Sequence, residues 1–158
     1  NNVYDIGCDD GYLLRRLRYL SGQLDGIDPS GVVVKDFPVT KGFFPGAVDE
    51  DKQQQSYDAI FALAVFEHFT ESDIKESARV ISKMLSPNGR LILTVPHPFV
   101  DEILDVLLWL RLIDGQALDE HHGFEPDDLE VYFSDTLKLV RKDTFQFGLN
   151  NIFIFERK

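Results

Sequence analysis

Short apolar runs alternate with amphipathic segments along this chain, and the alternation predicts a parallel β-sheet wrapped by helices. Strands are predicted where apolar residues stand together, and helices where they recur every three or four positions. The predicted strands span residues 3–6, 23–27, 40–44, 57–63, 90–95, 137–145 and 152–155. The predicted helices span residues 12–20, 32–37, 101–113 and 127–133, with another that Thr70 or Ser72 caps and that ends at Leu85.

Details of the pattern refine this fold. Residues 57–63 are almost continuously apolar, as expected of a central strand buried on both faces. The last two strands flank the tight connection Gly148-Leu149-Asn150-Asn151, which predicts an antiparallel hairpin. Residues 49–56 predict a loop or a poor helix, and Ser86-Pro87-Asn88-Gly89 predicts a turn. We therefore expect an α/β fold with a mostly parallel sheet, helices on both faces and an antiparallel C-terminal hairpin.

The composition limits the classes of function. The chain has the length of a single domain, residues 1–158, and its only methionine is Met84, so we expect that an N-terminal segment precedes this numbering. The formal net charge of −11 disfavours a nucleic-acid partner, because phosphate binding needs a basic face. The single cysteine, Cys8, can form no internal disulfide and suits a reducing, cytoplasmic compartment. We expect no metal site and no integral membrane segment.

The first predicted strand ends in a glycine-rich turn that leads directly into a helix. Asp5 stands near the end of the strand, and Gly7 and Gly11 bound the turn. Glycines let the backbone approach a ligand closely, and a helix N-terminus offers free N–H groups. The span from Gly7 to Gly11 is four residues rather than the five of dinucleotide folds, which suits a ligand with a ribose and an amino-acid end. Asp28, at the tip of the second strand, can accept hydrogen bonds from both ribose hydroxyls.

Several blocks of the chain together resemble the class I S-adenosylmethionine-dependent methyltransferase family. The block Asp5-Ile6-Gly7-Cys8-Asp9-Asp10-Gly11 is similar to the first motif of that family, and Asp28 takes the place of its ribose-binding acid. Tyr57-Asp58-Ala59-Ile60-Phe61 and Phe66-Glu67-His68-Phe69 are similar to the fourth-strand segment, and Leu85-Ser86-Pro87-Asn88-Gly89-Arg90 to the turn before the fifth strand. The resemblance covers nearly the whole chain and implies a Rossmann-like, doubly wound sheet of seven strands with S-adenosylmethionine as cofactor.

The resemblance implies a cofactor site at the carboxyl edge of the first, second and fourth strands. Two positions depart from the family pattern. Asp9 stands where the middle glycine is usual, and aspartate tolerates a positive φ better than most other residues. The segment Gly42-Phe43-Phe44 replaces one that often carries an acid for the adenine, so an aromatic ring there either stacks on adenine or belongs to the core. The predicted cofactor-binding residues are Asp5, Gly7, Cys8, Asp9, Gly11, Asp28, Pro29, Phe43, Ala62 and Leu63.

The reaction expected from the resemblance is methyl transfer to a small-molecule acceptor, with an oxygen of a saccharide, lipid-linked or quinone-type substrate as the nucleophile. A hydroxyl that keeps its proton needs a general base. His97 and His68 follow the fifth and fourth strands and are the catalytic candidates, although each also has an architectural interpretation. The candidate substrate residues are Trp109, His121 and His122.

Two other classes of function fit the same residues. A non-catalytic module that binds S-adenosylmethionine would keep the turn, and Asp9 is compatible with it. A nicotinamide-dependent oxidoreductase is disfavoured by the glycine spacing and by the lack of a Tyr-x-x-x-Lys pair. The expected partner is a small-molecule acceptor, and no nucleic acid is expected. The apolar helix of residues 100–113 either packs on the sheet as core or also lines an acceptor pocket or a homodimer interface.

Overall fold

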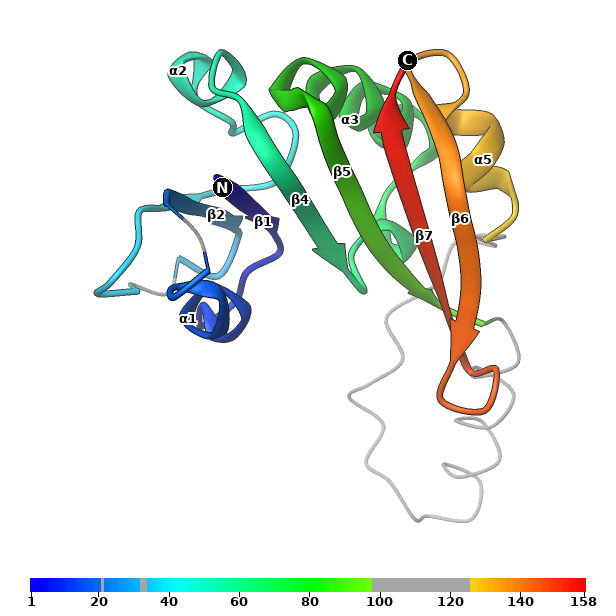
Figure 1. The fold of residues 1–158 in the computed structure, drawn as a ribbon, viewed down its shortest axis with the longest axis horizontal. Helices are drawn as coiled ribbons and strands as arrows, with labels where there is room; N and C mark the ends of the chain where they lie inside the picture. Colours follow the sequence, from blue (N-terminus) through cyan, green and yellow to red (C-terminus); the bar gives the residue numbers. More distant parts are fainter. Residues whose placement is uncertain (21, 32–33, 98–125) are drawn as a thin grey trace.

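A seven-stranded sheet forms the centre of the fold, in a computed structural model that describes residues 1–20, 22–31, 34–97 and 126–158. Its strands are β1 Val3–Ile6, β2 Leu24–Asp28, β3 Val39–Lys41, β4 Tyr57–Leu63, β5 Leu85–Pro96, β6 Leu137–Phe145 and β7 Asn150–Arg157. The strand order is β3-β2-β1-β4-β5-β7-β6 (Figure 1). The strands from β3 to β5 pair in parallel, and β7 is antiparallel to both β5 and β6, which confirms the predicted α/β sheet with its C-terminal hairpin.

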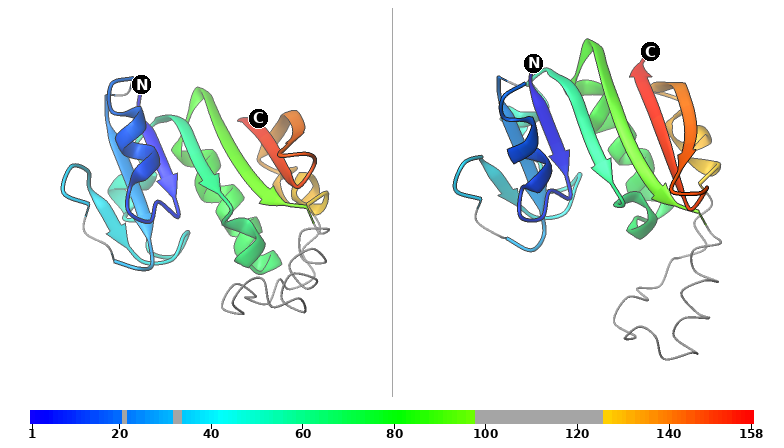
Figure 2. Two further views of the ribbon diagram at one scale, coloured as in Figure 1. Left: turned by 90° about the horizontal axis from the view of Figure 1, so that it is seen from below. Right: turned by 60° about the horizontal axis from the view of Figure 1, so that its bottom comes forward.

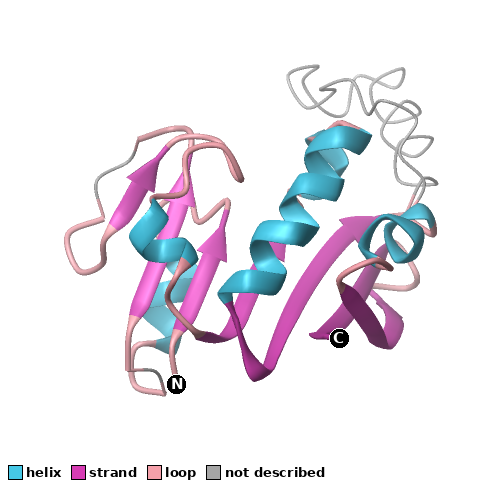
Figure 3. Ribbon diagram, turned by 90° about the horizontal axis from the view of Figure 1, so that it is seen from above, coloured by secondary structure: helices cyan, strands magenta, loops and turns pink. Residues whose placement is uncertain are grey.

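Helices lie on both faces of the sheet, as predicted. They are α1 Tyr12–Leu17, α2 Glu50–Gln53, the 3₁₀ helix η1 Phe66–His68, α3 Glu71–Met84 and α5 Asp128–Phe133. Helix α1 packs on β1 and β2 from one face, whereas α2 and α3 lie on the other (Figures 2 and 3). Thr70 caps α3, because its hydroxyl accepts a hydrogen bond from the backbone N–H of Asp73 at 3.2 Å.

Two apolar clusters hold the strands in place. The larger cluster packs α3 and α5 on the sheet and contains a series of aromatic rings, in which the Phe133 centroid lies 5.5 Å from that of Phe66 and 5.0 Å from that of Phe155. The smaller cluster, under α1, consists of Val3, Cys8, Leu14 and Leu24. Since β1 and β2 are packed on both faces, the loops at their carboxyl ends start from fixed positions.

Three predicted boundaries were wrong for reasons that lie in packing. Helix α1 ends at Leu17 rather than at residue 20, because Tyr19 and Leu20 are 81% and 73% exposed and have no core to pack against. Strand β3 covers Val39–Lys41 rather than residues 40–44, because the chain leaves the sheet after Lys41 and inserts Phe44 into the core. No helix forms in the described part of the predicted helix 32–37, residues 34–37, where the chain passes directly into β3.

The remaining differences concern turns. Strand β5 begins at Leu85, so the predicted turn Ser86-Pro87-Asn88-Gly89 lies inside the strand. There the pairing with β4 shifts from Tyr57↔Leu85 to Ala59↔Arg90, as in a β-bulge, which absorbs the additional residues. The polar segment 49–56 contains the short helix α2. The predicted helix 101–113 lies outside the described residues, and none of the described helices is long and apolar enough to cross a membrane.

Candidate functional site

The turn between β1 and α1 has an unusual backbone. Gly7, Asp9 and Gly11 all have positive φ angles, of 74°, 42° and 78°. The turn is fixed to the neighbouring strand β2, because the N–H of Gly7 donates to the carbonyl of Ile27 at 2.9 Å. Asp9 therefore adopts the left-handed region, which aspartate tolerates better than most other residues.

Glycine is required at both ends of this turn. A Cβ on Gly7 would lie 2.6 Å from Cγ2 of Val65, and a Cβ on Gly11 would lie 2.9 Å from Cγ1 of Val34. Both positions also have φ angles that L-residues rarely adopt. Val65 and Val34 therefore fill the space that a side chain at Gly7 or Gly11 would need. The turn follows the carboxyl end of β1, at the edge where ligands bind in open parallel sheets.

Asp28 is held in place by the turn. Its Oδ2 accepts a hydrogen bond from the backbone N–H of Asp9 at 2.9 Å, and its Oδ1 accepts one from the N–H of Ser30 at 2.8 Å. The side chain is 8% exposed, and burial alone would raise its pKa. The hydrogen bonds from Ser30 and Asp9 outweigh burial and hold the pKa of Asp28 below its usual range, so that the carboxylate is charged. The sequence indicated Asp28 but not this contact with Asp9.

Asp5 lies beside Asp28, and its pKa is shifted in the opposite direction. It is 3% exposed, and among the described residues no hydrogen bond or ion pair reaches its carboxyl. Burial, together with the negative charge of Asp28, raises the pKa of Asp5 to about 7. A buried carboxyl without a partner at the edge where ligands bind is a feature that functional sites often show.

Cys8 occupies the turn as a packed residue. It is 5% exposed, and its Sγ fills the space that a Cβ on Gly26 would need, 2.7 Å away. Burial, with the charges of Asp5 and Asp28, raises the pKa of the Cys8 thiol to about 12. Because the thiolate is the reactive form, Cys8 is not a nucleophile in this site.

The other predicted cofactor residues lie along the same edge with different exposures. Phe43 is 73% exposed just after β3, and Leu63 is 39% exposed at the end of β4. Pro29 is exposed directly after Asp28, whereas Ala62 is completely buried in the larger core. Phe43 and Leu63 thus present apolar side chains at the carboxyl edge of the sheet. The side chain of Ala62 is buried, so only its backbone is left to contact a ligand there.

The two catalytic candidates lie at the ends of neighbouring strands. His68 is the last residue of η1, which follows β4, and His97 directly follows β5, where its N–H donates to the carbonyl of Leu149 at 2.9 Å. Both residues are exposed. The predicted substrate residues Trp109, His121 and His122 lie outside the described residues.

The sequence reasoning missed Glu67, which precedes His68. It is 4% exposed, and its Oε2 has no hydrogen-bond partner among the described residues. Burial raises the pKa of Glu67 to about 7. The only signal in the sequence was its place in the block Phe66-Glu67-His68-Phe69, because a pattern does not reveal which charged residue is buried.

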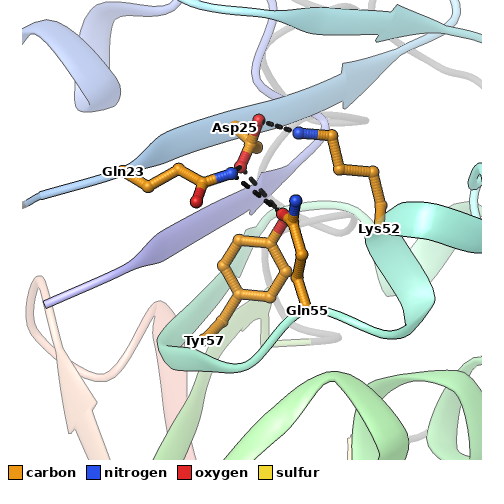
Figure 4. Close-up of polar contacts among 5 residues, drawn as sticks. All are labelled: Gln23, Asp25, Lys52, Gln55 and Tyr57. Atoms are coloured by element: carbon orange, nitrogen blue, oxygen red, sulfur yellow. Dashed lines mark hydrogen bonds and ion pairs between the residues drawn. The ribbon is translucent and has the colours of Figure 1, made fainter.

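A second buried aspartate lies on β2, near its amino end. Asp25 is completely buried, and Figure 4 shows the polar groups that surround it. Its carboxylate forms an ion pair with Lys52 of α2, accepts from Nε2 of Gln23 at 2.7 Å, and lies 3.0 Å from the hydroxyl of Tyr57. Gln55 lies 2.7 Å from the same hydroxyl. The carboxylate of Asp25 is therefore fully paired with side chains of the protein itself.

Comparison with known proteins identifies the family. A family model described as a methyltransferase domain matches residues 1–136. A tRNA U34 carboxymethyltransferase from Helicobacter pylori strain P12 is 30% identical over 172 residues, and the match covers 92% of this chain and 64% of that protein. One from Pseudoalteromonas translucida is 33% identical over 100 residues, which covers 58% of this chain and 30% of that protein. The chain therefore spans less than two thirds of the length of these relatives.

Solved structures share the fold at low sequence identity. A TehB-like S-adenosylmethionine-dependent methyltransferase from Corynebacterium glutamicum superposes with a TM-score of 0.73 at 14% identity, covering 99% of this chain and 80% of that one. The N-methyltransferase NodS from Bradyrhizobium japonicum, solved in complex with S-adenosyl-L-homocysteine, gives a TM-score of 0.69 at 13% identity, covering 99% and 78%. These likenesses confirm the Rossmann-like fold.

The comparisons correct one expectation and confirm two others. The exclusion of a nucleic-acid partner was wrong, because the curated relatives are named as enzymes that act on tRNA. Net charge is a sum over the whole surface and does not describe the field at one edge. The expectations of an enzyme and of S-adenosylmethionine as cofactor are confirmed. The chain belongs to the methyltransferase-domain family and is a class I S-adenosylmethionine-dependent methyltransferase.

Proposed function

We propose that the glycine turn and the end of β2 hold S-adenosylmethionine. The observation that carries this proposal is the position of Asp28, whose two oxygens accept the N–H groups of Asp9 and Ser30 and which remains ionised. A carboxylate has about four lone-pair sites, so the two backbone donors and the Ser30 side chain, which also hydrogen-bonds to Asp28, leave acceptor capacity for a ribose hydroxyl. In this proposal, Asp28 binds the ribose.

The other residues of the turn fit the rest of the cofactor. Gly7 and Gly11 carry no side chain, so the backbone of the turn can approach a ligand closely. The carboxyls of Asp5 and Asp9 suit a ligand that carries a sulfonium and an ammonium group. Phe43 is exposed where the adenine is expected. The remaining proposed contacts are made by Cys8, Pro29, Leu63 and the backbone of Ala62. When bound, S-adenosylmethionine supplies an electrophilic methyl group on its sulfonium.

The protein's own part in the reaction is to orient the acceptor, exclude water and, where needed, remove a proton. His68 follows β4, which pairs with β1, and His97 follows β5, which pairs with β4; both histidines are exposed. We propose that one of them takes the proton of the acceptor. Their substitution by Asn is expected to lower kcat and to leave cofactor affinity unchanged.

We propose a base of tRNA as the acceptor. The support is the similarity to tRNA U34 carboxymethyltransferases over 92% of the chain. The chain spans 64% of that relative, so the proposal concerns the transfer step at this edge and not the activity of a whole protein. The sequence-based expectation of an oxygen in a saccharide, lipid-linked or quinone-type acceptor is the alternative that the test separates. The cytoplasmic location expected from the sequence stays a prediction.

The test is a transfer assay with S-adenosylmethionine labelled in its methyl group. The protein is incubated with total bacterial tRNA and, separately, with a small-molecule and lipid extract. We expect label in acid-precipitable RNA that is lost after ribonuclease treatment, and no label with Asp28→Ala, while Asp143→Asn on β6 stays active. Mass spectrometry of the nucleosides then identifies the transferred group. Label confined to the extract, or label in RNA that persists with Asp28→Ala, would contradict the proposal.

A further inference from the structure

Asp5 and Asp28 form a pair of buried acids on neighbouring strands. Asp5 of β1 pairs in parallel register with Gly26 of β2, and Asp28 lies two residues further along. Since side chains alternate along a strand, Asp28 points to the same face as Gly26 and Asp5. Asp5 is 3% exposed and Asp28 is 8% exposed. The fold thus places two carboxyls together, in little water, at the carboxyl edge of the sheet.

The backbone satisfies one of these acids and leaves the other without a partner. Asp28 accepts hydrogen bonds from Asp9 and Ser30, whereas no described residue donates to Asp5. Close carboxyls disfavour double ionisation, so the charge of Asp28 keeps a proton on Asp5. This effect and burial together bring the pKa of Asp5 to about 7.

No described cation lies where it would neutralise Asp5. Strand β4 brings Phe61 opposite Asp5 in register, and Phe61 carries no charge. Among the turn residues near Asp5, Cys8 is a neutral thiol and Asp9 is another acid. On α1, Arg15 is bound to Asp10 at 2.8 Å.

Two further cations on the elements around the pair are also directed elsewhere. Arg16 of α1 hydrogen-bonds to the hydroxyl of Tyr12 at 2.9 Å. Lys41 of β3 stands opposite Asp28 in register, but its Nζ lies beside Gly31, 3.0 Å from the position that a Cβ there would take. Within the described residues, a positive charge next to Asp5 therefore has to come from a ligand.

We propose that Asp5 makes the site prefer the cationic methyl donor over its neutral product, and that Asp5 releases its proton to solvent when the cation binds. The inference rests on the proposed cofactor site. S-adenosylmethionine carries a sulfonium, which S-adenosylhomocysteine lacks, and the two molecules otherwise match. A carboxylate beside the sulfonium gains Coulomb energy in the buried site that it cannot gain beside a thioether.

This linkage makes donor affinity depend on pH in a defined direction. Below pH 7 the proton on Asp5 has to be displaced before the carboxylate can face the cation, so affinity for S-adenosylmethionine rises with pH. Between pH 5.5 and 7, a range below the pKa of an α-amino group, we expect an increase of roughly tenfold. Affinity for S-adenosylhomocysteine is expected to change by less than about twofold over the same range.

The test is isothermal titration calorimetry of the wild-type protein at pH 6 in two buffers with different ionisation enthalpies. The difference between the two heats counts the protons released. The ligands are S-adenosylmethionine, S-adenosylhomocysteine and sinefungin, an unreactive analogue with an amine in place of the methylsulfonium. We expect release of close to one proton with both cationic ligands and much less with the product. This comparison needs no variant.

Asp5→Asn supplies the second arm, with Asp143→Asn as the matched carboxyl-to-amide control on an exposed acid of β6. Asp5→Asn is expected to bind S-adenosylhomocysteine within about threefold of wild type, and to lose both the pH dependence and the preference for the cations. Equal proton release with all three ligands, or a preference that survives in Asp5→Asn, would overturn the inference. Failure of all three ligands to bind would instead contradict the proposed cofactor site.

Discussion

The two buried aspartates of β2, Asp25 and Asp28, differ in how the surrounding protein satisfies them, and we propose that only Asp28 binds a ligand. Asp25 is completely buried and is surrounded by the side chains of Lys52, Tyr57 and Gln23 (Figure 4). Asp28 accepts hydrogen bonds from the backbone N–H groups of Asp9 and Ser30 and from the Ser30 side chain, and beside it Asp5 has no described partner. The first acid is fully compensated within the protein, whereas the acids at the carboxyl edge leave capacity for a ligand.

The difference explains why burial alone does not identify a functional acid. A buried charge that is paired and hydrogen-bonded contributes to the fold, and breaking the pair is strongly destabilising. A buried carboxyl at a sheet edge that lacks a partner has a raised pKa instead, and it can bind a ligand or a proton. Substitutions at either end of β2 or around it, and changes of pH, should therefore affect stability and ligand affinity differently.

The largest effect on stability is expected from Lys52→Met. The variant removes the cation of the ion pair between Lys52 and Asp25. In this pair the Asp25 side chain is 1% exposed and the Lys52 side chain 18% exposed. Loss of the partner leaves a buried charge and should lower the free energy of unfolding by about 3 kcal/mol. Lys75→Met, which breaks an exposed pair with Glu71, is the control and should change it by less than about 0.5 kcal/mol. Urea denaturation measures both, and equal losses would show that burial of Asp25 does not matter.

Gly7→Ala is expected to damage the carboxyl edge. The new methyl would lie 2.6 Å from Val65, at a φ of +74°. We expect a loss of about 2 kcal/mol in the free energy of unfolding and at least tenfold weaker binding of S-adenosylhomocysteine. Gly46→Ala is the control, because no atom lies within 4 Å of its added Cβ. Unchanged binding of S-adenosylhomocysteine by Gly7→Ala would contradict a close approach of the turn backbone to the ligand.

The stability of the ligand-free protein should fall as pH rises from about 4 to 7. Asp5 and Glu67 both have pKa values raised to about 7 by burial, so the folded state binds more protons than the unfolded state in this range. Stability is therefore greatest below the unfolded pKa and decreases through the folded pKa, by on the order of 2 kcal/mol per group. Thermal unfolding at several pH values measures the slope. Asp5→Asn and Glu67→Gln should each flatten it, and an unchanged slope in both would contradict the assignment.

The smallest effect is expected from Asp9→Gly. The contact with Asp28 is made by the backbone N–H of residue 9, and Gly adopts a φ of 42° without strain. We expect stability to change by less than about 1 kcal/mol and cofactor affinity by less than about threefold. Gln146→Gly, at a similar φ of 51° in the β6–β7 hairpin, provides the comparison for backbone strain alone. A loss of binding above tenfold would give the Asp9 side chain a direct role.

The sequence predicted the sheet well because its signals are local. Apolar runs placed β1, β2 and β4, and the glycine spacing pointed to the turn and to Asp28. It could not show that Asp9 fixes Asp28, because this contact depends on a positive φ in the turn. Nor could it show that Asp25 is buried with partners and Glu67 without one for its Oε2, because patterns do not reveal which acids find partners after folding.

The exclusion of a nucleic-acid partner failed for another physical reason. Net charge averages the whole surface, whereas binding depends on the local field at one edge. The bulge in β5 was missed in a similar way, because Ser86-Pro87-Asn88-Gly89 has the composition of a turn and only its pairing with β4 shows it to be part of a strand. In both cases, a property read from the sequence, net charge or turn-like composition, did not show which groups lie next to each other in space.

The most direct test of the role of Asp28 is titration of S-adenosylhomocysteine into wild type, Asp28→Ala and Lys52→Met under identical conditions. We expect binding by wild type, binding within about threefold by Lys52→Met despite its lower stability, and at least a hundredfold weaker binding by Asp28→Ala, because the ribose hydroxyls lose a charged acceptor. Unchanged affinity in Asp28→Ala, or equal losses in the two variants, would contradict the assignment of one end of β2 to structure and the other to the cofactor.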